Sequence, residues 1–100
     1  MELTERQKRF LRKEAHPLKP VIAVGDKGVT PSLLEELGAA LEHHELIKVR
    51  VRVSDRDTRD QLIAELLAAN DATLVSRVGH IAAIYRPRRK RKPKIILPKA

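Results

Sequence analysis

The segment from residue 46 to residue 53 constrains the fold of this chain more than any other. In it Ile47, Val49, Val51 and Val53 alternate with Lys48, Arg50 and Arg52. Alternation with a period of two is typical of a β-strand that has one buried face and one exposed face. The sequence therefore predicts a strand over residues 46–53, with an apolar face on a core and three cations on the other face.

Two earlier segments predict a strand followed by a helix. Residues 21–24 are apolar at every position, which predicts a short central strand covered on both faces. Thr30-Pro31 predicts a helix start, because Thr is a good N-cap and the first helical position does not need the N–H that Pro lacks. We expect this helix to end near His43 and to face the core with Leu33, Leu34, Leu37 and Leu41.

The remaining segments complete an α-β-α-β-α-β-β order. Thr4 predicts the N-cap of a first helix that ends at Ala15, with Gln7 as its capping-box partner. A third helix is expected over residues 57–69, and strands over 73–78 and 81–86 flank a two-residue hairpin turn at Gly79-His80. Strand–helix–strand units favour parallel pairing, and a hairpin adds an antiparallel pair. We therefore expect an α/β fold with a four-stranded mixed sheet covered by helices.

The positive charge of the chain is concentrated at its C-terminal end. The net charge is +8, and residues 86–100 hold eight Lys or Arg and no acid, so the rest of the chain is formally neutral. Such an excess suggests a polyanionic partner. We predict a domain over residues 1–87 and a basic, flexible tail over 88–100, of which residues 95–97 could dock on the body. The candidate phosphate-binding residues of the tail are Arg86, Arg88, Arg89, Lys90, Arg91 and Lys92.

The run Gly25-Asp26-Lys27-Gly28 joins the apolar strand to the second helix. Glycines without a Cβ let a ligand approach the backbone, a helix start offers unpaired N–H groups, and Lys27 adds a cation. This arrangement suits one or two phosphates, although two glycines at such a place usually make only a turn. The run is not a Walker loop, which needs a longer glycine-rich stretch that ends in Lys-Ser or Lys-Thr.

Basic residues also follow helical and strand spacing in the body of the chain, separate from the acidic second helix. They predict a basic patch, although for any single residue the alternative is an ordinary solvated position. The candidates are Arg6, Arg9, Lys13, Lys19, Lys48, Arg50 and Arg52.

Several function classes find no support in the sequence. Aromatic residues make up 2% of the chain, which argues against stacking bases on several aromatic rings. No cysteine is present, and the adjacent His43 and His44 diverge by about 100° on a helix, so they are poor metal co-ligands. No nucleophile–base pairing stands out. We therefore expect no catalytic residues, metal or cofactor, and not an enzyme.

The chain also shows no sign of a membrane or secretory role. Its first residues lack the apolar stretch of a signal peptide, and no run reaches membrane-spanning length. We expect a cytoplasmic monomer that binds neither a membrane nor a small-molecule substrate.

Three long motifs resemble the CRM domain, and more narrowly the stand-alone bacterial YhbY-type proteins. They are residues 16–21 (HPLKPV), 24–30 (VGDKGVT) and 40–49 (ALEHHELIKV). The likeness spans about residues 2–87. It implies an α/β fold like the C-terminal domain of translation initiation factor three, with an additional N-terminal helix.

The resemblance also implies a function. It implies binding of structured RNA, with Gly25 to Gly28 as part of the contact surface, and for bacterial members association with precursors of the large ribosomal subunit and a role in its assembly. Asp26 departs from the many relatives with a polar or basic residue there, and its carboxylate would repel phosphate. We expect Lys27 to carry the charge, with Asp26 turned outward or capping the turn.

One alternative stays open at this point. The chain could be a protein-interaction or scaffolding module in which the acidic second helix docks a partner and RNA meets only the basic tail.

Overall fold

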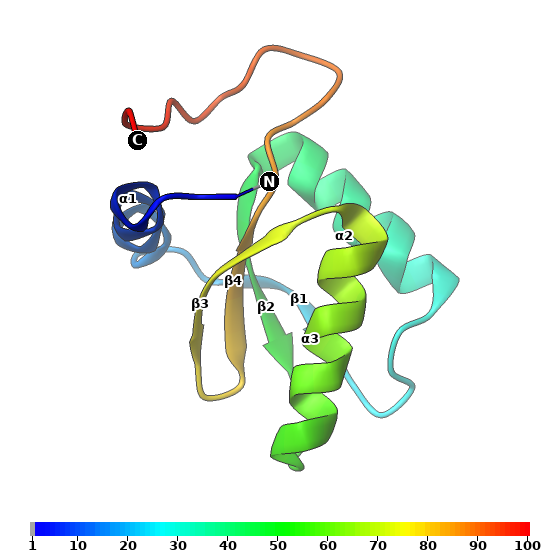
Figure 1. The fold of residues 1–100 in the computed structure, drawn as a ribbon. Coiled ribbons are helices and arrows are strands. Elements are labelled where there is room, and N and C mark those ends of the chain that lie inside the picture. The colour runs from blue at the N-terminus through cyan, green and yellow to red at the C-terminus, as the bar shows by residue number, and fades with distance from the viewer. Residues whose placement is uncertain (1) are drawn as a thin grey trace.

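The computed structural model describes residues 2–100 and has an α-β-α-β-α-β-β order around one sheet (Figure 1). The strand order is β1-β2-β4-β3, with β1 parallel to β2 and the other pairs antiparallel. The predicted α/β fold with a four-stranded mixed sheet is therefore confirmed. The elements are α1 (Glu5–Ala15), β1 (Pro20–Val24), α2 (Pro31–His44), β2 (Leu46–Val51), α3 (Arg56–Asn70), β3 (Thr73–Val78) and β4 (Ile81–Tyr85).

The helices begin where their polar capping residues predict. Thr4 and Gln7 form the expected capping box, in which the Thr4 hydroxyl accepts from the Gln7 N–H at 3.1 Å and Gln7 Oε1 accepts from the Thr4 N–H at 3.0 Å. Thr30 caps α2 by accepting from the Leu33 N–H, and Asp55 caps α3 by accepting from the Thr58 N–H. These side chains satisfy N–H groups that the first helical turn leaves without a partner.

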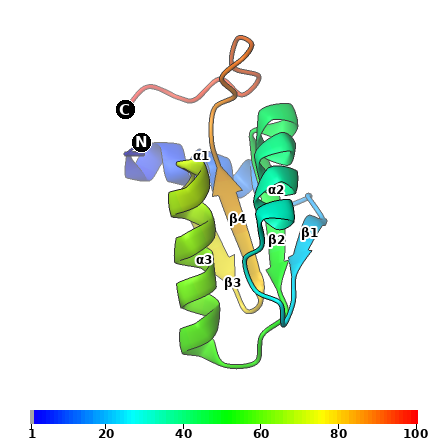
Figure 2. The ribbon, with the colours of Figure 1, turned by 90° about the vertical axis from the view of Figure 1, so that its right-hand side faces the viewer.

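Helices cover both faces of the sheet, but to different extents. Helices α2 and α3 lie on one face and α1 on the other (Figure 2). The larger core lies under α2 and α3, and a smaller one under α1 is built on Leu11 and Ala15. The smaller core takes its strand residues from Leu46, Val75, Ala83 and Tyr85, and from none of β1. The face that carries α1 is therefore open on its β1 side.

Strand β1 differs from the expectation of a central strand covered on both faces. It lies at the edge of the sheet and pairs only with β2. Ile22 and Val24 are buried, whereas Val21 is 53% exposed and Ala23 is also exposed. A short apolar run does not tell a strand buried on both faces from an edge strand. Here α1 packs on the other strands and leaves one face of β1 uncovered.

Strand β2 also differs in detail from the prediction. It ends at Val51, so Arg52 and Val53 lie beyond it, although the Arg52 N–H still donates to the Val24 carbonyl at 2.7 Å. Its outer face is not wholly basic. Leu46 lies on that face and is buried under α1, whereas Arg50 is exposed.

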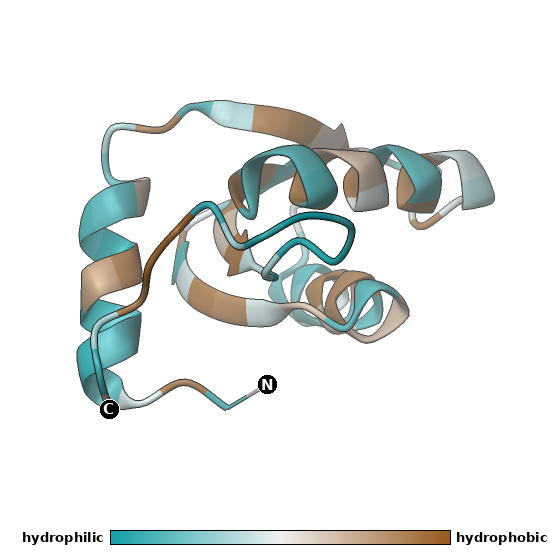
Figure 3. Cartoon of the chain, turned by 90° about the horizontal axis from the view of Figure 1, so that it is seen from above, coloured by the Kyte–Doolittle hydropathy of each residue, from teal (hydrophilic) through white to brown (hydrophobic). Residues whose placement is uncertain are grey.

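The C-terminal residues, for which a flexible tail is predicted, make defined contacts with the body of the domain. From the end of β4 they cross the end of α2 and reach α1 (Figure 1). Backbone N–H groups of the tail donate to the carboxylates of Glu42 and Glu45. Ile95 and Leu97 pack against the smaller core, and Figure 3 shows this hydrophobic end of the tail running along α1. The docking that the sequence allowed for residues 95–97 is thus present for Ile95 and Leu97, whereas Ile96 is exposed. The domain boundary at residue 87 stays a prediction.

The position of Leu37 generates a stability prediction. Its side chain is fully buried between α2 and the sheet, so Leu37→Ala is expected to lower the free energy of unfolding by about 2–5 kcal/mol. Val78→Ala is the control, because Val78 is 76% exposed and its truncation should change stability by less than about 0.5 kcal/mol. Urea unfolding followed by circular dichroism measures both. Equal losses in the two variants would contradict the packing described here.

Candidate nucleic-acid interface

The run Gly25-Asp26-Lys27-Gly28, called the glycine loop below, lies at the C-terminal ends of the parallel strands β1 and β2. The Gly28 N–H donates to the Gly25 carbonyl at 3.0 Å, which closes the turn. Helix α2 begins three residues later at Pro31. A shallow hollow of about 280 Å³ opens beside the loop and reaches Thr30 at the start of the helix. The loop backbone and a helix N-terminus therefore meet at one exposed place.

The two glycines of the loop differ in what the fold asks of them. Gly28 has a φ of 67°, in the left-handed region that disfavours residues with a Cβ. Gly25 lies outside that region, and a Cβ built on it would meet nothing within 4 Å. The fold therefore needs a glycine at position 28 but not at position 25. At position 25 the missing side chain leaves the backbone open to a ligand.

The two charged residues of the loop are both exposed. Asp26 forms no hydrogen bond or ion pair within residues 2–100, so it does not cap the turn. Of the two arrangements expected for Asp26, the structure therefore shows the one in which the side chain turns outward. Lys27 is equally free to reach an anion at the loop.

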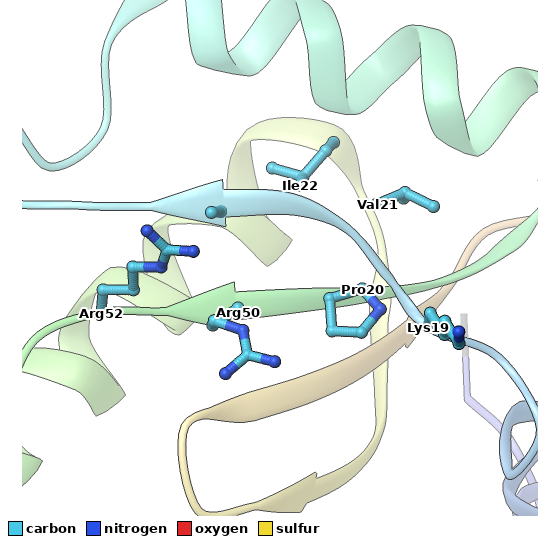
Figure 4. Close-up of a pocket in the computed structure, with 7 residues that line it drawn as sticks. Lys19, Pro20, Val21, Ile22, Arg50 and Arg52 are labelled. Carbon is cyan, nitrogen blue, oxygen red and sulfur yellow. The ribbon is translucent and has the colours of Figure 1, made fainter.

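Two of the predicted cations, Arg50 and Arg52, lie near the loop, and Lys19 shares a hollow with them from the far end of β1. Lys19, Arg50 and Arg52 line a hollow of about 430 Å³ over β1 and β2 (Figure 4). Ile22 points toward α2, whereas both arginines extend from the opposite side of the sheet (Figure 4). All three basic residues are exposed. The Arg52 N–H is bonded to the residue just before Gly25, so the Arg52 end of this basic hollow lies next to the glycine loop.

Lys48 lies further along β2 and has a different setting. Its Nζ donates to the His16 carbonyl at 3.3 Å, and its side chain is half-buried. It lines a hollow of about 450 Å³ between α1 and the sheet, whose wall also includes Arg12 and the exposed Val78. Arg12 was not among the predicted cations. A signal for it was available, because helical spacing places Arg12 on the flank of the apolar face of α1.

The structure does not bring the predicted cations of α1 to the loop. Arg6, Arg9 and Lys13 are exposed. Helical spacing places them opposite Leu11 and Ala15, so they face away from the sheet. They form a separate basic surface on the far side of α1.

Arg86 belongs to the body rather than to the exposed basic tail. It is 7% exposed, its Nη2 lies 3.3 Å from Glu42 Oε1, and its Nη1 donates to the Asn70 carbonyl at 3.4 Å. Its guanidinium is therefore occupied within the protein, which argues against the predicted role of Arg86 in binding RNA. The other candidates of the tail, Arg88, Arg89, Lys90, Arg91 and Lys92, lie at the opposite end of the molecule from the glycine loop (Figures 1 and 2).

Within residues 2–100, no three His, Asp or Glu side chains are grouped so that they could hold a metal ion. Over the same residues, no helix has the length and hydropathy needed to cross a bilayer.

Comparisons with known proteins agree with the motifs. The CRS1 / YhbY (CRM) domain model matches residues 3–86. The chain is 42% identical over 97 residues to an RNA-binding protein of Haemophilus influenzae, which covers 97% of this chain and 96% of the relative. It is 43% identical over 86 residues to a probable RNA-binding protein of Pseudomonas aeruginosa, with 86% and 83% covered.

A solved structure supports the fold as well. The solution structure of a hypothetical protein of Staphylococcus aureus, described as a candidate RNA-binding protein, superposes with a TM-score of 0.80 at 35% identity. The match covers 97% of this chain and 100% of the other. With the matched domain model and the relatives of similar length, these findings show that the chain belongs to the CRS1 / YhbY (CRM) domain family.

Proposed function

We propose that this protein binds structured RNA through the glycine loop and the basic hollow beside it. We further propose that this RNA is ribosomal, that it belongs to precursors of the large subunit, and that the protein takes part in their assembly as a cytoplasmic monomer without catalytic activity. The observation that carries the proposal is the exposed loop at the sheet edge, where a glycine not required by the fold lies next to Lys27, Arg50 and Arg52.

The chemistry of this edge suits a phosphate backbone. Loop N–H groups and the start of α2 offer hydrogen-bond donors and the positive end of a helix dipole. Lys27 supplies a mobile cation, while Arg50 and Arg52 supply planar donors that can bind phosphate oxygens in pairs. Because the sheet holds these groups on a rigid frame, the site recognises the spacing of phosphates rather than charge alone.

The lack of aromatic residues decides which kind of RNA suits the site. Phe10 and Tyr85 are the only aromatic rings besides histidine, and Tyr85 is buried. Proteins that read single-stranded RNA stack unpaired bases on exposed rings, whereas folded RNA is recognised by its shape, phosphates and 2′-hydroxyls. The proposal therefore favours folded RNA. The names of the relatives support RNA as the ligand, and the resemblance of the three long motifs supports its ribosomal identity.

Removing two cations of the edge is expected to weaken RNA binding specifically. We predict that Lys27→Ala with Arg50→Ala lowers the affinity for a transcript of precursor large-subunit RNA by about tenfold or more. The slope of log affinity against log salt should fall by roughly 1.8, because each phosphate contact contributes about 0.9. Filter binding at several salt concentrations measures both quantities.

A matched pair on α1 controls for net charge. Arg6→Ala with Lys13→Ala removes the same charge from the face that points away from the sheet, and it should weaken binding much less. If the Lys27 and Arg50 variant binds as tightly as the unaltered protein, the assignment of the loop and the sheet is wrong.

The scaffolding alternative has a separate test. In that alternative the acidic helix α2 docks a protein and RNA meets only the tail, yet Glu42 of this helix is already bonded to the tail of the same chain. Arg89→Gln, Lys90→Gln and Arg91→Gln together remove tail charge and keep the backbone donors. We expect partial loss of affinity for the same transcript in filter binding. Complete loss would favour the scaffolding alternative over the loop.

The glycine loop generates a further prediction with its own internal control. Gly25→Ala should change the free energy of unfolding by less than about 0.5 kcal/mol, because its Cβ would meet open space. It should nonetheless weaken RNA binding by about fivefold, the equivalent of one hydrogen bond. Gly28→Ala should lower stability by about 1–2 kcal/mol, because of its left-handed φ. Thermal unfolding and filter binding test both, and full affinity in Gly25→Ala would refute close approach at this residue.

A further inference from the structure

A buried carboxylate holds the basic tail in a defined path. Glu45, the residue after α2, is fully buried. Its Oε2 accepts from the Arg88 N–H at 2.9 Å, and its Oε1 accepts from the N–H groups of Lys94 at 2.8 Å and Ile95 at 2.6 Å. One carboxylate thus joins two tail segments that are six residues apart. Residues 88–94 are thereby closed into a loop.

A second carboxylate, one helical turn earlier, holds the outer part of this loop. Glu42 Oε1 accepts from the Arg89 N–H and Oε2 from the Lys90 N–H, both at 2.9 Å. Oε1 also pairs with the buried Arg86 guanidinium. The two backbone N–H groups hold the pKa of the Glu42 carboxyl below its usual range, so the carboxylate is charged when it binds the tail.

The donors to both carboxylates are backbone groups, which leaves most of the basic side chains free for another ligand; Arg88 Nε instead donates to the Lys92 carbonyl at 2.7 Å and braces the loop. A flexible polycation would be expected to meet two carboxylates with its cationic side chains. Here the main chain takes both carboxylates, and Lys90, Arg91 and Lys92 remain exposed. Arg89 makes only a long, exposed contact of 3.5 Å to Asp71, which contributes little in water. Residues 88–94 carry six positive charges, and the two carboxylates bound to their backbone carry only two negative charges, so this surface stays strongly positive.

The same loop borders a hollow at the end of α2. The hollow has a volume of about 600 Å³, and its wall includes Arg89, Lys90 and Arg91 together with Glu42, whose carboxylate is bonded to the tail backbone. A concave surface lined by several cations is complementary to a phosphate backbone that carries a dense negative charge. This place and the glycine loop lie at opposite ends of the molecule (Figures 1 and 2), whose longest dimension is 38 Å.

We infer that residues 88–94 form a second RNA-binding surface, shaped in advance by Glu42 and Glu45, which contacts a different segment of folded RNA from the one at the glycine loop. This inference rests on the proposed function. Ordering the tail before binding removes an entropy cost from the bound state. Two surfaces on one rigid body then hold the RNA more tightly than either does alone. The two acids thus strengthen binding to a polyanion, which is the opposite of their direct electrostatic effect.

The test uses this difference: removing the two acids should weaken RNA binding, whereas removing negative charge alone should strengthen it. Glu42→Gln with Glu45→Gln leaves each side chain one carbonyl oxygen where the tail needs two acceptors. We expect this pair to weaken binding to the precursor large-subunit transcript by about tenfold in filter binding, although it removes two negative charges. Glu35→Gln with Glu36→Gln removes the same charge from exposed positions of α2 that make no contact with the tail, and it should bind as tightly or more tightly.

A second background shows whether the two acids act through the tail. In a protein in which Arg89, Lys90 and Arg91 are all changed to Gln, adding the double substitution Glu42→Gln with Glu45→Gln should change the affinity for the transcript by less than about twofold. The reason is that the surface that the two acids shape has already lost its charge. An equal tenfold loss in that background would mean that the acids act through the fold of the body, and would overturn the inference. The inference would also be overturned if the Glu42→Gln, Glu45→Gln variant bound the transcript as tightly as the Glu35→Gln, Glu36→Gln control.

Hydrogen exchange separates this inference from the proposed function. The amides of Arg88, Lys94 and Ile95 should exchange slowly in the free protein and at least tenfold faster in Glu45→Gln. Fast exchange in the unaltered protein would overturn the shaped surface even if the RNA binds. If these amides are protected but the unaltered protein does not bind the transcript, the proposed function fails, and the inferred second surface for that RNA fails with it.

Discussion

The structure depends on strand β2, which pairs with β1 on one side and with β4 on the other and is packed on both faces. Ile47, Val49 and Val51 point into the larger core, and Leu46 points into the smaller one under α1. Since side chains alternate along a strand, a shift of one residue would exchange these faces and bury Arg50. The register of this one strand therefore positions the basic residues as well as the core.

The pairing of β2 also decides where the two basic regions lie. Because β1 runs parallel to β2, the loop after β1 emerges at the edge where β2 ends, next to Arg52. Because β4 runs antiparallel to β2, the chain leaves β4 at the opposite edge, beside the start of β2 and the end of α2. The glycine loop and the basic tail are thus placed at opposite ends by strand direction, while the body between them is held together by aliphatic packing.

The acids of α2 show how tertiary contacts change the meaning of a charge pattern. In the sequence, the negative charge of this helix looks like a surface that is simply separate from the cations. In the structure, Glu35 and Glu36 are exposed as that pattern suggests. Glu42 and Glu45 instead accept five backbone N–H groups of the tail. A buried carboxylate is costly unless such donors compensate it, so the acids and the tail depend on each other.

The sequence by itself determined the element order, the helix starts and the glycine loop, because capping residues, periodicity and turn glycines act over a few neighbouring positions. Only the tertiary structure decided that β1 is an edge strand, that Arg86 is buried, and that the tail docks on two carboxylates. Each of these depends on contacts between segments far apart in the chain. Local pattern does not contain them, since Glu45 and the amides it binds are 43 to 50 residues apart.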